Sequence, residues 1–148
     1  MTVIVWDGKT LAADKEMMSG YLKTPTVTKI RRSITGSLMG GTGNASMVNE
    51  LFAWWEAGAR PADWPATNRD SKDCSHLIVI LAGNKAVRTY QCGPYPIELE
   101  GDKQAWGSGS EAAMAALLCG CDAKKAVEIT NTIVSGCGSG VDTLTIED

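Results

Sequence analysis

The stretch that decides the fold is the start of the chain, Met1-Thr2-Val3-Ile4-Val5-Trp6-Asp7-Gly8-Lys9-Thr10-Leu11-Ala12-Ala13-Asp14. The β-branched and apolar residues from Thr2 to Trp6 predict a strand, and Asp7-Gly8 supplies a two-residue turn of the kind that closes hairpins. The segment from Thr10 to Ala13 then returns as the second strand. The sequence therefore predicts a tight hairpin with Thr2 at its edge and a carboxylate at its end.

Thr2 combines two chemical functions if it becomes the amino-terminal residue. It directly follows Met1, so trimming of Met1 gives it a free α-amine beside its own hydroxyl. A hydroxyl nucleophile and an amine base in one residue are the parts of an N-terminal nucleophile. An α-amine with an ordinary pKa of about 8 is partly deprotonated near neutral pH and can accept a proton. Many cytosolic proteins also begin Met-Thr for no chemical reason, so the rest of the chain has to decide.

The composition is that of a globular protein and argues against nucleic acid and membranes as partners. The 148 residues are 44% hydrophobic and 21% charged, which predicts one domain over residues 1–148. The net charge of −3 does not provide the excess of positive charge that binds nucleic acid or an anionic membrane. No apolar run approaches the ~20 residues that span a bilayer, and no secretory leader opens the sequence. We therefore expect a cytoplasmic protein with neither nucleic acid nor membrane as partner.

The cysteines are odd in number and irregular in spacing. They are Cys74, Cys92, Cys119, Cys121 and Cys137. In a reducing compartment we expect free thiols, several of them buried as small hydrophobic residues. The Cys119-Gly120-Cys121 segment lacks a second pair of zinc ligands, and the single histidine, His76, lies far away in sequence. The cysteine spacing thus does not predict a zinc site.

Strands and helices are expected in separate groups along the chain. We expect further strands over 26–32, 33–39, 77–82, 86–90 and 141–146, and helices after residue 44, over 111–118 and after residue 122. Ser110 is the predicted cap of the second helix, and Ala126, Ile129 and Ile133 form the predicted buried stripe of the third. Segregated strands and helices indicate an α+β fold. A four-layer αββα sandwich, with two sheets inside and helices outside, fits this order.

Five short blocks occur in an order that is itself informative. They are residues 2–5 (Thr-Val-Ile-Val), 11–14 (Leu-Ala-Ala-Asp), 27–32 (Val-Thr-Lys-Ile-Arg-Arg), 40–45 (Gly-Gly-Thr-Gly-Asn-Ala) and 107–110 (Gly-Ser-Gly-Ser). With these blocks the chain resembles the proteasome β-subunit family, and most of all the bacterial HslV-type peptidase subunit, an N-terminal-nucleophile hydrolase. The chain is shorter than typical members, with trimmed turns after Asp14 and Arg32, which suggests a phage or divergent bacterial version.

The resemblance implies a role for each of four side chains. The Thr2 hydroxyl would attack the scissile carbonyl and form an acyl-enzyme, with the α-amine of Thr2 as the base. The Lys29 ammonium would lie beside that hydroxyl and favour the deprotonated amine and the developing alkoxide. Asp14 would pair with Lys29 and orient it. Ser108 matches the family's serine near the nucleophile, which helps relay protons; a simple helix-entry loop is the alternative interpretation of Ser108.

Two further sites follow from the resemblance. The backbone amide of Ser37 matches the oxyanion hole, where the family usually has glycine. The loop from Gly136 to Asp142 matches one in which backbone carbonyls of HslV-type subunits can hold a monovalent cation such as sodium. By position, its ligands would be Gly136, Ser139 and Asp142. The Asp that proteasome subunits place near the start of this loop is replaced here by Gly136 or Cys137. Catalysis itself would need no cofactor.

The resulting prediction is a threonine endopeptidase subunit that assembles with itself into a ring and hydrolyses unfolded polypeptide. The resemblance implies a double ring of six or seven subunits fed by an ATP-dependent unfoldase. Trp54 and Trp55, which a small monomer would bury incompletely, agree with an interface; packing of both in the core of the monomer is the alternative interpretation. Two alternatives stay open. One is a non-catalytic structural or peptide-binding relative, favoured by Ser37 and the missing loop Asp, and the other is a small-amide hydrolase of the same fold.

Overall fold

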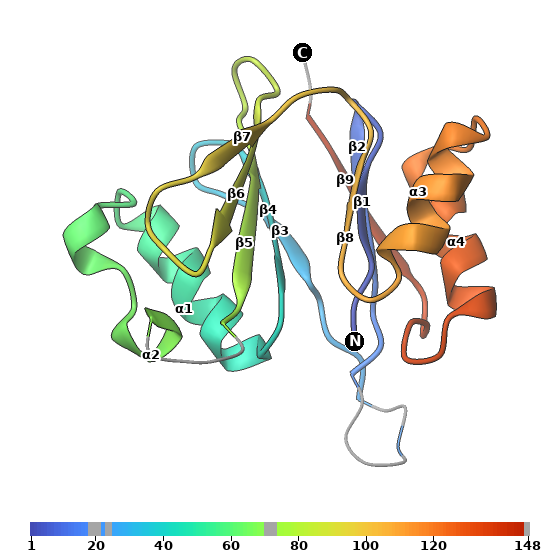
Figure 1. The fold of residues 1–148 in the computed structure, drawn as a ribbon, viewed down its shortest axis with the longest axis horizontal. Helices are drawn as coiled ribbons and strands as arrows, with labels where there is room; N and C mark the ends of the chain where they lie inside the picture. The colour runs from blue at the N-terminus through green and yellow to red at the C-terminus, as the bar shows by residue number, and fades with distance from the viewer. Residues whose placement is uncertain (18–21, 23–24, 70–73, 147–148) are drawn as a thin grey trace. The chain divides into compact units, whose positions relative to one another are not determined.

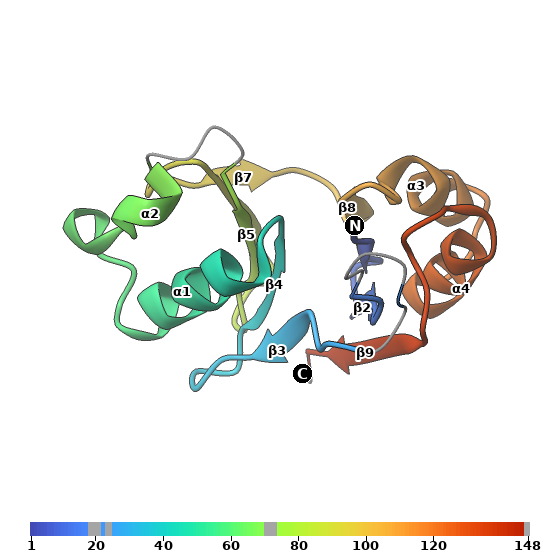
Figure 2. The ribbon, with the colours of Figure 1, turned by 90° about the horizontal axis from the view of Figure 1, so that it is seen from below.

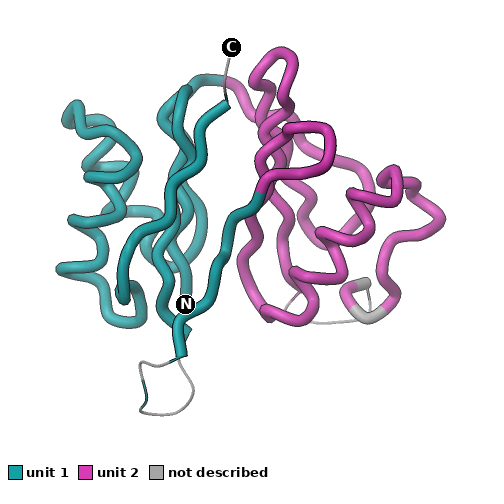
Figure 3. The backbone as a smooth tube through the Cα atoms, turned by 180° about the vertical axis from the view of Figure 1, so that it is seen from behind, with its two compact units in different colours: residues 1–31, 101–148 teal, residues 32–100 magenta. Residues whose placement is uncertain are grey.

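The chain divides into two compact units in a computed structural model that describes residues 1–17, 22, 25–69 and 74–146. Unit 1 comprises Met1–Arg31 and Gly101–Asp148, and unit 2 comprises Arg32–Glu100. Figure 3 shows the two units in different colours. Unit 1 is thus built from both ends of the chain, whereas unit 2 is one continuous segment. The prediction of one domain over residues 1–148 stays a prediction.

Unit 1 consists of a four-stranded antiparallel sheet and two helices. The sheet has the order β8-β1-β2-β9, and its strands are β1 (Ile4–Trp6), β2 (Thr10–Asp14), β8 (Gln104–Trp106) and β9 (Val141–Thr145). Helices α3 (Ser110–Leu118) and α4 (Ala123–Ile133) cover one face of this sheet (Figures 1 and 2). Small apolar side chains fill the space between sheet and helices, among them Val3, Val5, Ala12, Ala113, Ala126 and Val127. Small residues allow the helices to approach the sheet closely.

The predicted hairpin is present, with its turn one residue later than expected. The amide of Asp7 donates to the carbonyl oxygen of Thr10, so Gly8 and Lys9 form the turn. Gly8 has a φ of +95°, which favours glycine. The carboxylate of Asp7 accepts hydrogen bonds from the amides of Lys9 and Thr10 and, at 2.8 Å, from the amide of Ala123, the first residue of α4. Asp7 therefore fixes both the turn and the start of a helix.

The second sheet has five antiparallel strands in the order β3-β4-β5-β6-β7. They are β3 (Ile30–Arg32), β4 (Leu38–Thr42), β5 (His76–Ile80), β6 (Val87–Gln91) and β7 (Ile97–Leu99). Helix α1 (Ala45–Glu56) covers one face of this sheet beside β4 and β5 (Figure 2) and is followed by the short helices η1 (Pro61–Asp63) and α2 (Ala66–Arg69). The side chain of Asn44 caps α1 by accepting hydrogen bonds from Ser46 and Met47.

An aromatic cluster forms the core between α1 and the sheet of unit 2. The ring of Trp54 contacts Trp64 edge-on at 4.8 Å and Tyr90 at 5.1 Å between centroids. The indole N–H of Trp54 donates to the carbonyl oxygen of Arg60 at 2.8 Å. Trp54 is only 4% exposed, so the expectation that it contributes an unburied face is wrong. Trp55 is half-buried beside Tyr90 and packs against the same cluster.

Three local expectations are also corrected. The strand expected over 33–39 is a turn followed by β4, which begins at Leu38 and includes two of the glycines interpreted as a break. Ser110 is the first residue of α3 and follows the cap residue Gly109, which makes no side-chain capping bond. In α4, Ile133 is 66% exposed, and the buried stripe consists of Ala123, Ala126, Val127 and Thr130. These four residues follow one another at spacings of one or three residues, which places them on one face of the helix, whereas Ile133 is its last residue.

The α+β class with two antiparallel sheets covered by helices is confirmed. Among the described residues, no helix combines the length and the apolar character that crossing a membrane requires.

Gly41 is predicted to be intolerant of any side chain, because a β-carbon there would overlap Val48 of α1. Gly41→Ala should lower the free energy of unfolding by about 1–3 kcal/mol, as overpacked cores do, measured by urea denaturation. Gly83→Ala is the matched control, because a β-carbon at Gly83 meets nothing within 4 Å and its stability should change little. Equal stability of the two variants would contradict the packing argument.

Candidate active site

The register of the first hairpin brings the start of β1 beside the end of β2. Ile4 pairs with Ala13, so Val3 lies opposite Asp14. The amide of Asp14 donates to the carbonyl oxygen of Val3, and the amide of Val3 donates to the Asp14 carboxylate at 3.1 Å. Thr2, the preceding residue, is consequently held next to this carboxylate. The hairpin alone thus brings together two of the predicted site residues.

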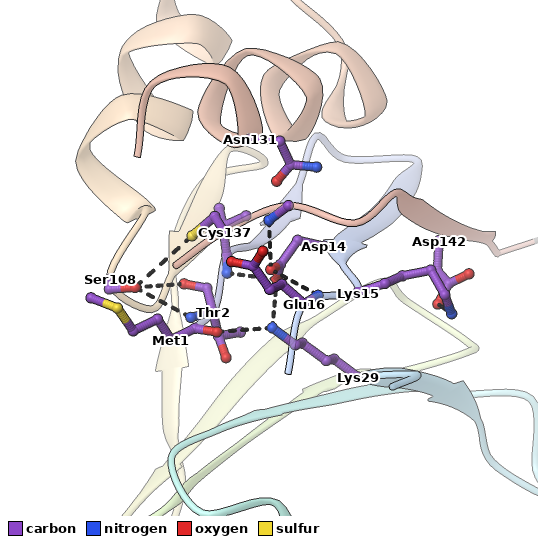
Figure 4. A network of polar contacts seen from close by, with 12 residues as sticks. Met1, Thr2, Asp14, Lys15, Glu16, Lys29, Ser108, Asn131, Cys137 and Asp142 are labelled. Carbon is purple, nitrogen blue, oxygen red and sulfur yellow. Dashed lines mark hydrogen bonds and ion pairs between the residues drawn. The ribbon is translucent and has the colours of Figure 1, made fainter. Parts of the chain in front are cut away.

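Asp14 is completely buried and is the centre of a hydrogen-bond network (Figure 4). Its Oδ1 accepts from the Lys29 ammonium at 2.8 Å in addition to the amide of Val3. Its Oδ2 accepts from the amides of Gly138 at 3.2 Å and Glu16 at 3.4 Å. A buried carboxylate is costly unless such donors surround it. Asp14 is therefore satisfied by one cation and three backbone amides.

Lys29 lies just before β3, and its side chain is 9% exposed. Its ammonium also donates to the carbonyl oxygen of Met1 at 2.9 Å. That oxygen belongs to the peptide bond between Met1 and Thr2. The predicted Asp14–Lys29 pair is therefore present, and its positive charge is directed at the bond whose cleavage would make Thr2 amino-terminal.

Ser108 contacts the other side of Thr2. The amide nitrogen of Thr2 donates to Ser108 Oγ at 3.2 Å, and this hydroxyl lies 3.4 Å from the carbonyl oxygen of Thr2, to which it donates. The amide of Gly109 donates to the same carbonyl at 3.2 Å. Gly107 has a φ of +95°, and a β-carbon there would overlap the Thr2 carbonyl oxygen. The glycines on either side of Ser108 thus allow the loop to approach the Thr2 backbone closely.

Cys137 is a site residue to which sequence reasoning gave no role. Its sulfur is 4.0 Å from Ser108 Oγ. Burial, followed by the negative charge of Asp14, raises the pKa of the Cys137 thiol above its ordinary value. The thiol is therefore neutral at neutral pH. The signal in the sequence was the place of Cys137 in the loop between α4 and β9, which the resemblance matches to a loop of the site.

Ser37 belongs to unit 2, where its backbone amide donates to Ser33 Oγ at 3.0 Å. Its hydroxyl accepts from the amide of Ala82 at 3.2 Å. The amide predicted to stabilise an oxyanion thus already has an acceptor within its own turn. The oxyanion role of Ser37 stays a prediction.

Of the residues predicted to hold a monovalent cation, Gly136 and Ser139 lie in the loop before β9, and Asp142 is the second residue of β9. Gly136 and Ser139 have φ values of +89° and +64°, so the backbone turns sharply there. The Asp142 carboxylate is paired with the Lys15 ammonium at 2.8 Å, which already supplies a positive charge. Neutral backbone carbonyls are suitable ligands for a hard cation. The cation site at Gly136, Ser139 and Asp142 stays a prediction.

Comparison with known proteins finds similarity in structure alone. No family model matches the chain, and no curated protein matches it. Thiobacillus denitrificans BPH is similar with a TM-score of 0.69 and 18% identity over 99% of both chains. The same protein in complex with epoxomicin gives a TM-score of 0.71 and 17% identity over 100% of both chains. Eukaryotic HslV from Trypanosoma brucei gives 0.66 and 20% identity over 99% of both chains.

These similarities define the class of the fold. All three compared chains are matched along essentially their whole length, so the likeness extends over both units of the chain. The chain therefore has the α+β fold of the proteasome-like, HslV-type proteins. The particular proteins that share it here are BPH and HslV, and the resemblance drawn from the five sequence blocks is confirmed at the level of the fold.

The raised pKa predicts that Cys137 reacts slowly with alkylating agents. A pKa above the ordinary range leaves less thiolate at pH 8, and burial restricts access further. In native protein at pH 8, iodoacetamide should modify Cys137 at least about tenfold more slowly than the exposed Cys119, as followed by peptide mass spectrometry. Similar rates for the two cysteines in native protein would contradict this description of the site. Denatured protein, in which the burial of Cys137 is lost, is the control.

Proposed function

We propose that the chain is a threonine endopeptidase subunit in which Thr2, once amino-terminal, attacks peptide bonds of unfolded polypeptide. One observation carries the proposal: both sides of the Met1–Thr2 peptide bond are engaged by predicted catalytic residues. The nitrogen of Thr2 is 3.2 Å from Ser108 Oγ, and the carbonyl oxygen of Met1 is 2.9 Å from the Lys29 ammonium.

Removal of Met1 changes the chemistry of both contacts. The nitrogen of Thr2 becomes an α-amine, which remains near Ser108 and acts as the base for the hydroxyl of Thr2. The Lys29 ammonium loses the Met1 carbonyl as acceptor, so one of its donors becomes available to stabilise negative charge on Thr2 Oγ. Asp14 keeps the ammonium in place because the carboxylate is buried and bonded to it at 2.8 Å.

The reaction then proceeds through an ester of Thr2. The hydroxyl oxygen adds to the substrate carbonyl while its proton passes to the α-amine, and the protonated amine donates this proton to the leaving nitrogen. The resulting acyl-enzyme is hydrolysed by a water molecule that the same amine activates. Ser108 relays protons at the amine, and the amide of Ser37 is the proposed oxyanion donor, a contribution of ~3 kcal/mol for a preorganised donor.

The assembly and its partners are part of the proposal. The fold likeness to HslV supports a homo-oligomeric ring, doubled from six or seven subunits, and an ATP-dependent unfoldase that delivers polypeptide. We further propose a cytoplasmic location, no cofactor for catalysis, and a structural monovalent cation such as sodium at Gly136, Ser139 and Asp142. Sedimentation of the purified chain at micromolar concentration tests the ring.

A second candidate function is a non-catalytic, peptide-binding subunit of the same fold. The observation that favours it is the Ser37 amide, which already donates to Ser33 Oγ and would have to exchange that acceptor for an oxyanion. The neutral thiol of Cys137, at a position where the family has an acid, also favours a non-catalytic subunit. Hydrolysis of a fluorogenic peptide distinguishes this candidate from the peptidase, and hydrolysis of small amides alone would indicate an amidase.

Replacement of the nucleophile should separate catalysis from folding. Thr2→Ala should reduce hydrolysis of a fluorogenic peptide to the buffer rate, because no hydroxyl remains to form the acyl-enzyme. Thr2→Ser should keep a fraction of the activity, since both the hydroxyl and the amine survive. Both variants should melt within a few degrees of the wild type, because the substitution removes little packed surface.

Two controls belong to this experiment. Activity should track the fraction of chains that begin at Thr2, measured by intact mass, because retained Met1 converts the amine base into an amide. Epoxomicin, which is bound to the Thiobacillus BPH of similar fold, should inhibit the active preparation. Full activity of Thr2→Ala would disprove the threonine mechanism.

Lys29 should be needed for catalysis more than for folding. Lys29→Ala should lower kcat by more than about 100-fold, because positive charge beside the nucleophile is lost. The three amides that also donate to Asp14 should preserve the fold at reduced stability. Lys15→Ala is the matched control: it breaks the more exposed pair with Asp142 and should leave kcat within a few-fold of wild type. Unchanged kcat in Lys29→Ala would contradict the proposed role.

A further inference from the structure

Unit 2 contains a cluster of soft metal-ligand side chains to which the peptidase proposal gives no role. It consists of Cys74, His76 and Cys92, whose sulfur and ring-nitrogen atoms all lie within 4.8 Å of one another. Cys92 Sγ is 3.9 Å from His76 Nε2. No other group of three or more such donors occurs within the described ranges 1–17, 22, 25–69 and 74–146. The only histidine of the chain is thus placed between two cysteines.

The ladder between β5 and β6 brings these three residues together. His76, the first residue of β5, pairs with Gln91, the last residue of β6, and Cys92 follows directly. Cys74 precedes His76 by two residues, the spacing that places side chains on the same face of an extended segment. Cys92 has a φ of +60°, an uncommon conformation for a residue other than glycine. Such strained residues persist where the surrounding structure enforces them, and they gather at functional sites.

The backbone between Cys74 and His76 is rigidly held. Ser75 is fully buried; its amide donates to Asn68 Oδ1 at 2.7 Å, and its carbonyl oxygen accepts from Asn68 Nδ2 at 3.1 Å. Ser75 Oγ accepts from the amide of Asn44 at 3.0 Å. These bonds fix the segment that carries two of the three donors. Preorganised donors are what a metal site requires.

Cys74 and Cys92 form a disulfide in the structure, with their Cα atoms 5.4 Å apart. The expectation of free thiols is therefore wrong for these two residues, because the sheet brings together cysteines that are 18 residues apart in sequence. Cys119, Cys121 and Cys137 are free. A dithiol reductant can convert the disulfide into two thiols by thiol–disulfide exchange: it supplies two electrons and two protons and itself becomes a disulfide.

We propose that the reduced chain binds Zn²⁺ through Cys74, His76 and Cys92, and that the disulfide is the metal-free, oxidised state of the same site. Each thiol loses its proton on binding, while the imidazole binds in its neutral form. Tetrahedral Zn²⁺ holds sulfur at ~2.3 Å and nitrogen at ~2.0 Å, which separates the two ligand atoms by about 3.5 Å. The 3.9 Å between Cys92 Sγ and His76 Nε2 is close to this value.

The chemistry of the donors selects the metal. Two thiolates and an imidazole favour Zn²⁺ over Mg²⁺ or Ca²⁺, which prefer oxygen ligands. Cys92 is exposed and Cys74 and His76 are partly buried, so an ion can reach the site from solvent. Three protein ligands leave the fourth tetrahedral position for water. A disulfide oxidant can reverse the reduction by thiol–disulfide exchange: it takes up two electrons and is reduced to two thiols, while Cys74 and Cys92 form their disulfide and release the ion, so binding depends on the redox state of the surroundings.

Cobalt(II) is the probe for this site, because tetrahedral thiolate coordination gives it visible absorption bands. The full-length, tag-free chain is reduced with a non-thiol phosphine, and Co²⁺ is added to the reduced and to the oxidised protein. One Co²⁺ per reduced chain should produce thiolate charge-transfer and d–d bands, which Zn²⁺ should abolish by displacement. The oxidised wild type should show none, and this comparison requires no substitution.

Variants assign the ligands. Cys74→Ser and Cys92→Ser should each lose the bands, and His76→Asn should weaken Co²⁺ binding, with folding of each checked by circular dichroism. Cys119→Ser and Cys121→Ser are the matched controls and should bind Co²⁺ as the wild type does. The proposal is overturned if the reduced wild type gives no bands, if the oxidised form gives the same bands, or if a control variant loses them.

Discussion

The ion pair and hydrogen bonds of the buried Asp14 carboxylate are the constraint on which the site in unit 1 depends. An uncompensated carboxylate in this position would cost several kcal/mol, so the fold has to supply donors on every side. It does so with Lys29 and with the amides of Val3, Glu16 and Gly138. These donors come from four separate segments. One carboxylate therefore fixes the start of β1, the exit of β2, the approach to β3 and the loop before β9.

Close packing around Thr2 follows from this constraint. With Val3 tied to the carboxylate, the carbonyl of Thr2 faces the loop at Gly107 and Gly109, where any larger residue at Gly107 would collide with it. Ser108 lies between the two glycines and is the side chain that contacts the Thr2 backbone. If Thr2 is the nucleophile of the proposed function, this backbone hold means that it loses little entropy on approaching a substrate, which is the physical advantage of a preorganised site. The proposed chemistry at Thr2 thus depends on backbone geometry as much as on side-chain identity.

Unit 2 is organised by different interactions, and its proposed zinc site is independent of the peptidase proposal. Its core is an aromatic cluster around Trp54, and its turns are fixed by polar side chains such as Asn68. The same polar bonds hold the backbone beside Cys74 and His76. A metal bound there would stabilise the end of the β5–β6 ladder, since ligands that bind only the folded state add to its stability.

The sequence by itself determined the hairpin and the closeness of Thr2 to Asp14, because strand propensity and a glycine-containing turn act over a few neighbouring residues. The family blocks added Lys29 and Ser108. Tertiary structure alone decided that Cys137 lies beside Ser108, that Trp54 is buried, and that Cys74, His76 and Cys92 meet. These contacts join residues far apart along the chain, and no local pattern encodes them. They depend on strand register and on the distance at which helices pack, which are set only when the whole sheet forms.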